Sequence, residues 1–367
     1  MSRSFDAVVI GAGVFGAWTA LQLRRSGRTV GLVDIYGAGN SRSSSGGESR
    51  ILRMGYGADE IYTRWAMRSR ELWLKLFEQI GRPELFQNTG VLWTPPPGDT
   101  RAASIETAFE RCGVAFQRLA PADLARAFPQ FRFRDDRMGL YETQAGVILA
   151  RRAVQAVVAQ AVREGVEYRH EATAARDSSG IVVYACGPWL PKIFPEVLGG
   201  RIRVTRQEVF FFGPPAEDPS FAPPLMPAWT DITDEHSAYT IPDLENRGFK
   251  LAFDRHGEEF DPDSGDRAVR GLTEARAFLA ERFPALAAAP LVESRVCQYE
   301  NTSNGDFLID RHPELDNVWL VGGGSGHGFK HGPAVGEHVC ARIDGRVAAE
   351  PRFSLETKAR EHQRSVF

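Results

Sequence analysis

Two glycine-rich turns, about three hundred residues apart, carry the residue types best suited to binding a phosphate-bearing ligand. Residues 5 to 34 read FDAVVIGAGVFGAWTALQLRRSGRTVGLVD, and residues 319 to 336 read WLVGGGSGHGFKHGPAVG. In each, an apolar run breaks into glycines before a helix pattern, so backbone N–H groups can approach an anion closely. The pair indicates one cofactor that is held from both ends of the chain.

The first turn fits the fingerprint of a dinucleotide-binding strand–turn–helix unit. Gly11 makes the tight turn, Gly13 leaves room for a pyrophosphate, and Gly16 lets helix and strand pack. Asp34, 23 positions after Gly11 (34 minus 11), is placed to accept hydrogen bonds from a ribose. An acid at this position disfavours a 2′-phosphate, so FAD or NAD is expected rather than NADP. The alternative is the same unit with no ligand.

The loop that follows is rich in hydroxyl groups and has two arginines near its end. Ser41 to Arg53 reads SRSSSGGESRILR, in which Arg50 and Arg53 stand three positions apart. The guanidinium fork matches a carboxylate, so the loop is a candidate site for an acidic substrate. A solvated basic loop is the alternative interpretation.

The composition excludes several classes of protein. A chain of 367 residues is long enough for two domains. The formal charge of −3, without a basic stripe, argues against nucleic acid as a partner. No apolar run approaches the ~20 residues of a membrane span, so a cytoplasmic protein is expected. Its four cysteines show neither CxxC pairing nor metal-ligand spacing, so neither disulfides nor a metal site is expected.

Hydrophobic periodicity predicts the elements that position these residues. Helices are expected at 59–80, 100–112, 121–128, 152–164 and about 264–283, and strands at 7–10, 90–94, 180–187, 291–299, 307–310 and 318–321. The stretch 201–253 alternates β-branched and aromatic residues with turns, which is typical of an antiparallel sheet. Dinucleotide-type pieces at both ends and in the middle, separated by β-rich stretches, indicate two interleaved discontinuous domains.

Together, these segments resemble the monomeric sarcosine oxidase branch of the D-amino-acid-oxidase-like FAD amine oxidases, over essentially the whole chain. The matching segments are VVIGAGVFGAWTALQL with LVD, GGESRILRMGYG, GFKLAF and RVCQYENTSNGDFLIDRHPELDNVWLVGGGSGHGFKHGP, the last being the most specific. The resemblance implies an α/β fold in which a Rossmann-type FAD-binding domain (1–83, 145–200 and 296–367) is interleaved with an α+β substrate domain (84–144 and 201–295) built on a largely antiparallel sheet.

The resemblance also implies a covalent flavin. Cys297 matches the cysteine whose sulfur is bonded to the flavin in this branch, a reaction that requires a thiolate and nearby positive charge or oriented N–H groups. The backbone of residues 326–330 is the expected donor. Without the resemblance, Cys297 would be interpreted as a small buried apolar residue.

Lys330 and Arg53 match the two cations that bind the substrate carboxylate in this family, and so fix the substrate over the flavin. A surface lysine at a helix start is a physically poor alternative, because a helix N-terminus is already positive. Lys250 matches the lysine that accelerates reaction with oxygen, and Arg50 an arginine packed near the flavin. Tyr299 matches a tyrosine that lines the substrate pocket, although a tyrosine in the core is nearly as good an interpretation.

The expected contacts with the cofactor extend over both turns and the hydroxyl-rich loop. The residues are Gly11, Gly13, Val14, Phe15, Gly16, Asp34, Ser45, Ser49, Arg50, Cys297, Gly326, His327, Gly328, Phe329 and Lys330. The chain also departs from the family pattern. Asp254 and Gly46 stand where the family has histidines, so the resemblance does not by itself imply sarcosine as the substrate. The stretch Val166 to Gly180 is shorter than in the family, and the contacts to adenine made there do not transfer.

The resemblance implies an FAD-dependent oxidase of a secondary or N-substituted amino acid that has a carboxylate. Molecular oxygen would be the electron acceptor, hydrogen peroxide a product, and the resulting imine would hydrolyse. One alternative is an FAD dehydrogenase that passes electrons to a quinone or a protein. Another is a non-catalytic FAD-binding protein. A monomer is expected.

Overall fold

The computed structural model describes residues 5–171, 180–231 and 237–362. In this part of the chain, a sheet of six strands contains the nucleotide-type elements, in the order β16-β17-β10-β1-β2-β9. Its strands are β1 (Ala7–Ile10), β2 (Val30–Val33), β9 (Glu167–Arg169), β10 (Ile181–Tyr184), β16 (Leu308–Arg311) and β17 (Val318–Gly322). Neighbouring strands run parallel except β16 and β17. The central strands β1, β2, β10 and β17 are short and continuously apolar, which fits a sheet that is covered on both faces.

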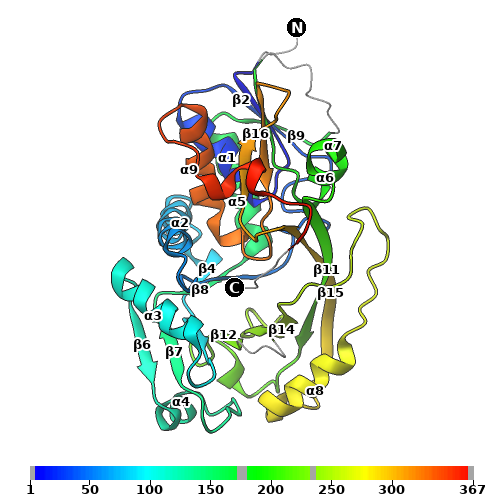
Figure 1. Cartoon of the computed structure of the whole chain (residues 1–367). Coiled ribbons are helices and arrows are strands. Elements are labelled where there is room, and N and C mark those ends of the chain that lie inside the picture. The colour runs from blue at the N-terminus through cyan, green and yellow to red at the C-terminus, as the bar shows by residue number, and fades with distance from the viewer. Residues whose placement is uncertain (1–4, 172–179, 232–236, 363–367) are drawn as a thin grey trace.

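Helices α1 (Val14–Arg25) and α9 (Gly332–Ile343) pack against each other in the upper part of the molecule (Figure 1). Two glycines of α9 permit this close approach. A Cβ on Gly336 would lie 2.7 Å from the backbone of Trp18, and one on Gly332 would lie 2.5 Å from the side chain of Val14. The same segment therefore supplies a glycine turn at its start and a helix–helix contact further on. Helix α5 (Ala150–Arg163) contacts α1 as well.

A second sheet of eight strands, in the order β15-β11-β14-β13-β12-β5-β7-β6, extends into the lower part of the molecule (Figure 1). It contains β5 (Val91–Trp93), β6 (Phe116–Leu119), β7 (Gly139–Glu142), β11 (Ile202–Phe212), β12 (Ala228–Asp231), β13 (Ala238–Ile241), β14 (Phe249–Phe253) and β15 (Leu291–Thr302). All of its pairs are antiparallel except β5 with β12. Its long strands β11 and β15 connect this sheet to the region of the first one.

The remaining elements cover these sheets or connect them. The helices are α2 (Glu60–Gln79), α3 (Thr100–Cys112), α4 (Pro121–Ala127), α6 (Leu190–Ile193), α7 (Pro195–Leu198) and α8 (Leu272–Arg282). A small sheet joins β3 (Arg50–Leu52), β8 (Gly146–Ile148) and β4 (Phe86–Gln87). Short 3-10 turns lie at Pro83–Leu85, Gly187–Trp189, Pro219–Phe221, Pro284–Leu286, Phe329–His331, Pro351–Phe353 and Leu355–Thr357.

The α/β fold class that the sequence predicts is confirmed, and most predicted elements lie within a few residues of the observed ones. The main difference is α8, which begins at Leu272 rather than near residue 264. The carboxylate of Glu208 accepts hydrogen bonds from the backbone N–H groups of Arg270 and Gly271, at 2.9 and 2.7 Å. This contact comes from a strand 62 positions earlier (270 minus 208), so local sequence patterns could not indicate it.

The division of the chain into an FAD-binding and a substrate domain is a proposal that the two large sheets support. In the stretch Val166 to Gly180, which is short relative to the family, residues 172–179 lie outside the described residues. The same holds for 232–236 within the predicted antiparallel region. No helix among the described residues is long and apolar enough to cross a membrane.

Candidate active site

A cavity of about 320 Å³ crosses the carboxyl ends of three strands of the six-stranded sheet. Gly11 follows β1, Gly187 follows β10, and Gly324 follows β17, and all three line this cavity, which we call the cofactor groove. Ligands of open parallel sheets bind at this edge. The lining of the groove also includes Asp34, Tyr299 and Phe329.

The three glycines of the first turn differ in what surrounds them. A Cβ on Gly11 would lie 2.4 Å from the carbonyl oxygen of Ala185, and one on Gly16 only 1.8 Å from that of Gly11. A Cβ on Gly13 would meet nothing nearer than the Ser45 hydroxyl, at 3.4 Å. Gly11 and Gly16 are therefore required by packing, whereas Gly13 borders open space. This is the arrangement that a passing pyrophosphate requires.

Asp34 and Ser45 hold the first turn in place. The Asp34 carboxylate accepts hydrogen bonds from the N–H groups of Ala12 (2.7 Å) and Tyr36 (2.8 Å) and still lines the groove. The Ser45 hydroxyl accepts one from the N–H of Val14, at 3.0 Å. Each carboxylate oxygen can accept more than one hydrogen bond, so Asp34 retains capacity for a ribose. The residues fit the dinucleotide part of FAD.

A second cavity, of about 120 Å³, lies beside the groove, and we call it the substrate cavity. It brings together side chains from both ends and the middle of the chain: Arg50, Arg53, Tyr239, Lys250, Asp254, Cys297, Tyr299, His327 and Lys330. Tyr299, Gly326 and Phe329 line both cavities, as does Arg50. Of the described residues that we expected at the cofactor, Gly16 and Ser49 line neither cavity, and the carbonyl of Ser49 instead accepts hydrogen bonds from Arg50 and Lys250.

Lys330 lies in the 3-10 turn before α9 and is held by a network of buried groups. Its ammonium group donates to the Tyr56 hydroxyl at 2.7 Å and to the carbonyl of His327 at 3.0 Å. The same hydroxyl lies 2.7 Å from Nε2 of His331 and 3.3 Å from Nδ1 of His327. Burial, followed by the charge of Arg53, keeps the pKa of Lys330 well below its usual value. A bound carboxylate would offset both effects.

Arg53 lies at the same cavity, with its guanidinium group between two aromatic rings. It is 4.7 Å from the ring centre of Tyr56 and 4.8 Å from that of Trp93, and it donates to the carbonyl of Gly55. Buried Glu142 accepts hydrogen bonds from the Trp93 indole (2.7 Å) and the N–H of Met54 (2.7 Å). Glu142 thus fixes the Trp93 ring beside the Arg53 guanidinium group and also the backbone that follows Arg53.

Lys250 and Cys297 also line the substrate cavity. The Lys250 ammonium donates to the carbonyl of Ser49 at 3.0 Å, and burial, followed by the charge of Arg50, holds its pKa well below the usual value. Nη2 of Arg50 lies 3.5 Å from the sulfur of Cys297. An arginine at this distance stabilises negative charge on sulfur. Arg50 also donates to the carbonyl of Ser44 at 2.7 Å, which fixes its position.

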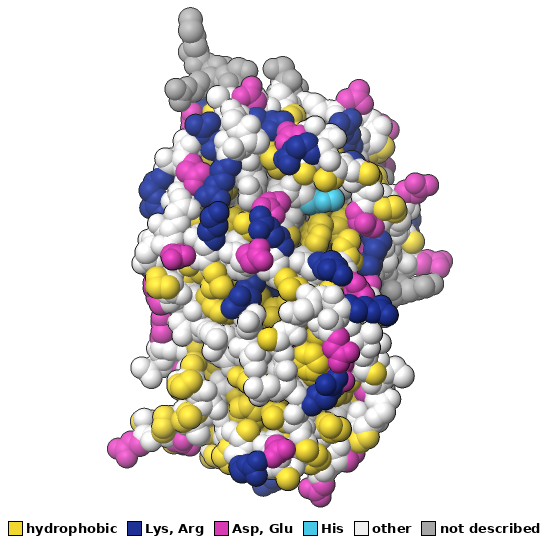
Figure 2. Space-filling view, turned by 90° about the vertical axis from the view of Figure 1, so that its left-hand side faces the viewer, with side chains coloured by type: hydrophobic (Ala, Val, Ile, Leu, Met, Phe, Trp, Pro, Cys, Tyr) yellow, Lys and Arg dark blue, Asp and Glu magenta, His cyan; other side chains and the backbone are white. Residues whose placement is uncertain are grey.

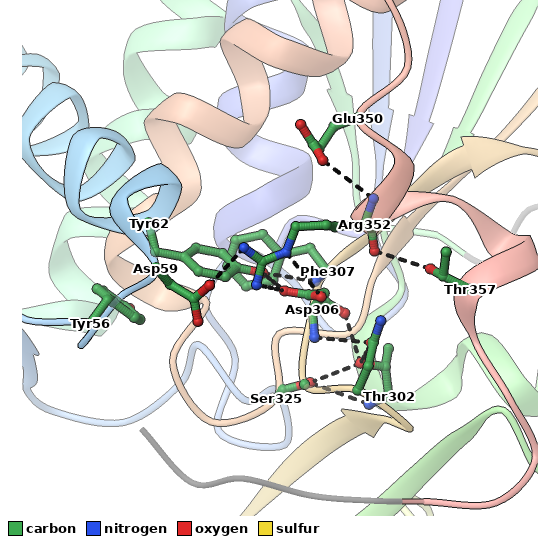
Figure 3. A network of polar contacts seen from close by, with 12 residues as sticks. Tyr56, Asp59, Tyr62, Thr302, Asp306, Phe307, Ser325, Glu350, Arg352 and Thr357 are labelled. Carbon is green, nitrogen blue, oxygen red and sulfur yellow. Dashed lines mark hydrogen bonds and ion pairs between the residues drawn. The ribbon is translucent and has the colours of Figure 1, made fainter. Parts of the chain in front are cut away.

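Polar contacts behind the C-terminal glycine turn hold it rigidly (Figure 3). The Ser325 hydroxyl accepts a hydrogen bond from the N–H of Thr302 (3.2 Å), and the Thr302 hydroxyl donates to the carbonyl of Asp306 (2.7 Å). Arg352 then bridges the carboxylates of Asp306 and Asp59, at 2.9 and 2.8 Å. Within the turn, a Cβ on Gly326 would lie 2.7 Å from the Tyr299 ring. The turn and its tyrosine therefore fit together only with glycine at this position.

The outer face formed by α2 and α9 is covered by charged side chains of both signs (Figure 2). Arg68 of α2 pairs with Glu337 of α9 at 2.8 Å. Exposed pairs of this kind contribute little to stability. They link the two helices around the buried site without adding a charge to it.

The two departures from the family pattern differ in their surroundings. Gly46 has no room for a side chain, because a Cβ would lie 1.8 Å from the carbonyl oxygen of Asn40. Asp254 follows β14, four positions after Lys250 on the same face of the strand, and lines the substrate cavity. The cavity therefore contains a carboxylate as well as cations.

Several residues of the site were not predicted from the sequence: Tyr56, Glu142, Glu300 and His331. Tyr56 lies in the matched loop, three positions after Arg53, but nothing in its spacing indicates a contact with Lys330, 274 positions further on. Glu142 could have been noticed as a single acid at the end of an apolar strand, a pattern that suggests a buried charge. Strand β15 also carries Glu293 and Arg295, so its pattern gives no such signal for Glu300.

Comparisons with known proteins identify the family. The family model "FAD dependent oxidoreductase" matches residues 6–342. Monomeric sarcosine oxidase of Streptomyces avermitilis is 30% identical, covering 92% of this chain and 93% of its own. Peroxisomal sarcosine oxidase of Mus musculus is 29% identical (91% and 90%), and N-methyl-L-tryptophan oxidase of Yersinia pestis is 27% identical (91% and 93%).

Solved structures share the fold. L-proline dehydrogenase from P. horikoshii superposes with a TM-score of 0.80 at 22% identity, covering 97% of this chain and 98% of that chain. Glycine oxidase from Geobacillus kaustophilus gives 0.76 at 20% identity (96% and 99%). The family model covers most of the chain, and the groove and its glycine turns fit an FAD site. The chain therefore belongs to the DAO family of FAD-dependent oxidoreductases.

Proposed function

We propose that this enzyme is an FAD-dependent oxidase of a secondary or N-substituted amino acid. The observation that carries the proposal is that Arg53 and Lys330 line one buried cavity directly beside the cofactor groove. Two cations there suit a carboxylate and would fix the substrate at one end. The curated relatives support an N-methylated substrate, because their names include sarcosine and N-methyl-L-tryptophan.

In this proposal the protein groups bind and orient the substrate. The substrate carboxylate lies between Arg53 and Lys330, and Tyr299 lies where the cavity meets the groove. Bound FAD supplies the redox chemistry: it accepts hydride from the C–H bond next to the amine nitrogen and returns the electrons to oxygen as hydrogen peroxide. The imine product then hydrolyses. Lys250 is the cation that would stabilise negative charge developing on oxygen.

Asp254 influences which substrate side chains the cavity accepts. Its carboxylate lines the same cavity and disfavours a second negative charge in the substrate. Neutral or cationic N-methyl amino acids are therefore expected to be better substrates than N-methylated aspartate or glutamate.

We also propose that the flavin is covalently bound through Cys297. Its sulfur lines the substrate cavity beside Arg50, the position in which charge assists a thiolate. Protein precipitated with acid should remain yellow, whereas Cys297→Ser should release its flavin into the supernatant. Free flavin from the wild-type protein would refute covalent attachment without affecting the rest of the proposal.

The decisive test of function is flavin reduction without oxygen, monitored by loss of visible absorbance. The panel contains sarcosine, N-methyl amino acids of each charge type, cyclic imino acids and glycated amino acids. Bleaching by none of them would contradict the oxidase proposal and favour a non-catalytic FAD-binding protein. Admitting oxygen then distinguishes an oxidase, which forms peroxide rapidly, from a dehydrogenase that needs a quinone or protein acceptor. A monomer in the cytoplasm is part of the same proposal.

A further inference from the structure

Glu300 places a buried carboxyl group in the middle of the cofactor groove. It lies on β15 next to Tyr299, and its side chain reaches over the carboxyl ends of β10 and β17. A Cβ on Gly187, which follows β10, would lie 3.7 Å from Oε2, and one on Gly322, at the end of β17, would lie 3.3 Å from it. The glycine turn after the neighbouring strand β1 lines the same groove. A ligand that occupies the groove therefore lies close to this carboxyl group.

The two oxygens of Glu300 are not equally satisfied. Oε1 accepts a hydrogen bond from the N–H of Gly324 at 3.2 Å. Oε2 has no hydrogen-bond partner in the part of the chain that the structure describes, although the residue is only 7% exposed. Burial raises the pKa of Glu300 to about 7, although the backbone N–H groups of Gly324 and Gly323 act to lower it. A buried carboxyl group without a cation beside it is more stable in the protonated form, which can donate one hydrogen bond.

We propose that Glu300 is a cofactor-binding residue whose protonated carboxyl donates a hydrogen bond from Oε2 to an oxygen of the phosphate and polyol linker of FAD. This inference depends on the FAD family alone and not on the oxidase reaction proposed above. It adds a residue to the site that the glycine motifs do not indicate.

The proposal has a consequence for pH. An ionised Glu300 would have no proton to donate and would repel the negatively charged phosphates, so FAD binding is linked to protonation of this group. Below pH 7 the group is protonated and FAD is held tightly. Above about pH 7, Glu300 is ionised in the free protein and must take up a proton when FAD binds. The affinity for FAD therefore falls by up to about tenfold per pH unit.

The other titratable groups of the groove do not produce this slope. Burial raises the pKa of Cys186 and of Tyr299, so both stay neutral near pH 7. Arg50 stays charged, and Asp34 already accepts two backbone hydrogen bonds. Glu171 and Asp263 are exposed carboxylates that also line the groove.

The test measures the equilibrium release of FAD on dilution of the full-length holoenzyme between pH 6 and pH 9, from flavin fluorescence, and gives the dissociation constant at each pH. All proteins carry Cys297→Ser, which makes binding reversible whether or not the wild-type flavin is covalently attached. With Glu300 present, the dissociation constant should rise by up to about tenfold per pH unit above about pH 7. Glu300→Gln, which keeps the shape and an N–H donor but cannot ionise, should hold FAD equally tightly at every pH. Glu300→Ala should be equally independent of pH, with a dissociation constant about 2- to 10-fold higher than that of Gln.

Glu171→Gln is the matched control, because it removes an exposed carboxylate that lines the same groove and should leave the slope unchanged. Release from the Glu300 protein that does not depend on pH would overturn the proposal. So would a slope that persists in Glu300→Gln, or one that disappears in Glu171→Gln. None of these outcomes depends on substrate turnover, so failure here is distinct from failure of the proposed oxidase reaction.

Discussion

Lys250 and Lys330 line the same cavity and are held in different ways. They are 1% and 4% exposed, and burial lowers the pKa of both. Lys330 donates to the Tyr56 hydroxyl and to the His327 carbonyl, which leaves one of its three N–H bonds for a ligand. In the described part of the chain, Lys250 donates to the Ser49 carbonyl alone. The first arrangement suits a carboxylate that must be held in one orientation, and the second suits a small anion that forms transiently.

The largest expected effect concerns Lys250. Lys250→Met removes the cation proposed to assist oxygen, so reoxidation of the reduced flavin should slow by about 10²- to 10³-fold, while reduction by substrate changes little. Stopped-flow measurement of the two half-reactions separates them. Lys75→Met, at an exposed lysine of α2, is the control. Equal slowing of both half-reactions would remove the distinction between the two lysines.

Lys330→Met should have the reverse pattern. Loss of one charge-assisted contact to the carboxylate should reduce kcat/KM of flavin reduction for amino acids by about 10- to 100-fold. Reoxidation and flavin retention should stay near wild type. Substrates that lack a carboxylate provide the internal control, because their turnover should not depend on this lysine. If acids and amines without a carboxylate were affected equally, Lys330 would not be the carboxylate site.

Tyr56→Phe tests whether the position of Lys330 matters in addition to its charge. The change removes the hydroxyl 2.7 Å from the ammonium but retains the ring beside Arg53. KM for amino acids should rise by about fivefold, the value of one hydrogen bond, with kcat for the oxygen reaction unchanged. Tyr36→Phe, at a half-buried tyrosine of the groove, is a matched control. An unchanged KM would mean that His327 alone positions the lysine.

The last expected effect is on the pH dependence of binding. Because the pKa of Lys330 is depressed in the free protein and a bound carboxylate raises it, binding of an acid takes up a proton. Affinity for acetate should therefore fall as pH rises through the pKa of the free protein, by at most tenfold per pH unit. Calorimetry in buffers with different ionisation enthalpies measures the proton uptake directly. Lys330→Met should abolish it, and uptake that persists in this variant would assign the proton to another group.

The elements could be predicted largely from the sequence, because strands such as β1 and helices such as α3 are specified by local periodicity and caps. Helix α3 begins and ends where its sequence pattern does. The Asp99 carboxylate accepts hydrogen bonds from the N–H groups of Arg101 and Ala102, and Gly113 ends the helix in the left-handed conformation. The first residue of helix α8 could not be predicted as accurately, because it depends on contacts with Glu208 of a distant strand.

The sequence by itself determined the two glycine turns, the acid at Asp34, the pair Arg50 and Arg53, and the family to which they belong. These are short-range patterns in which spacing alone specifies geometry. Only the tertiary structure decided which groups hold Lys330, that Glu142 supports the Arg53 loop, and that Glu300 reaches into the groove with an oxygen that lacks a partner. These contacts join residues up to 274 positions apart. They depend on how two sheets meet, and no local pattern encodes that.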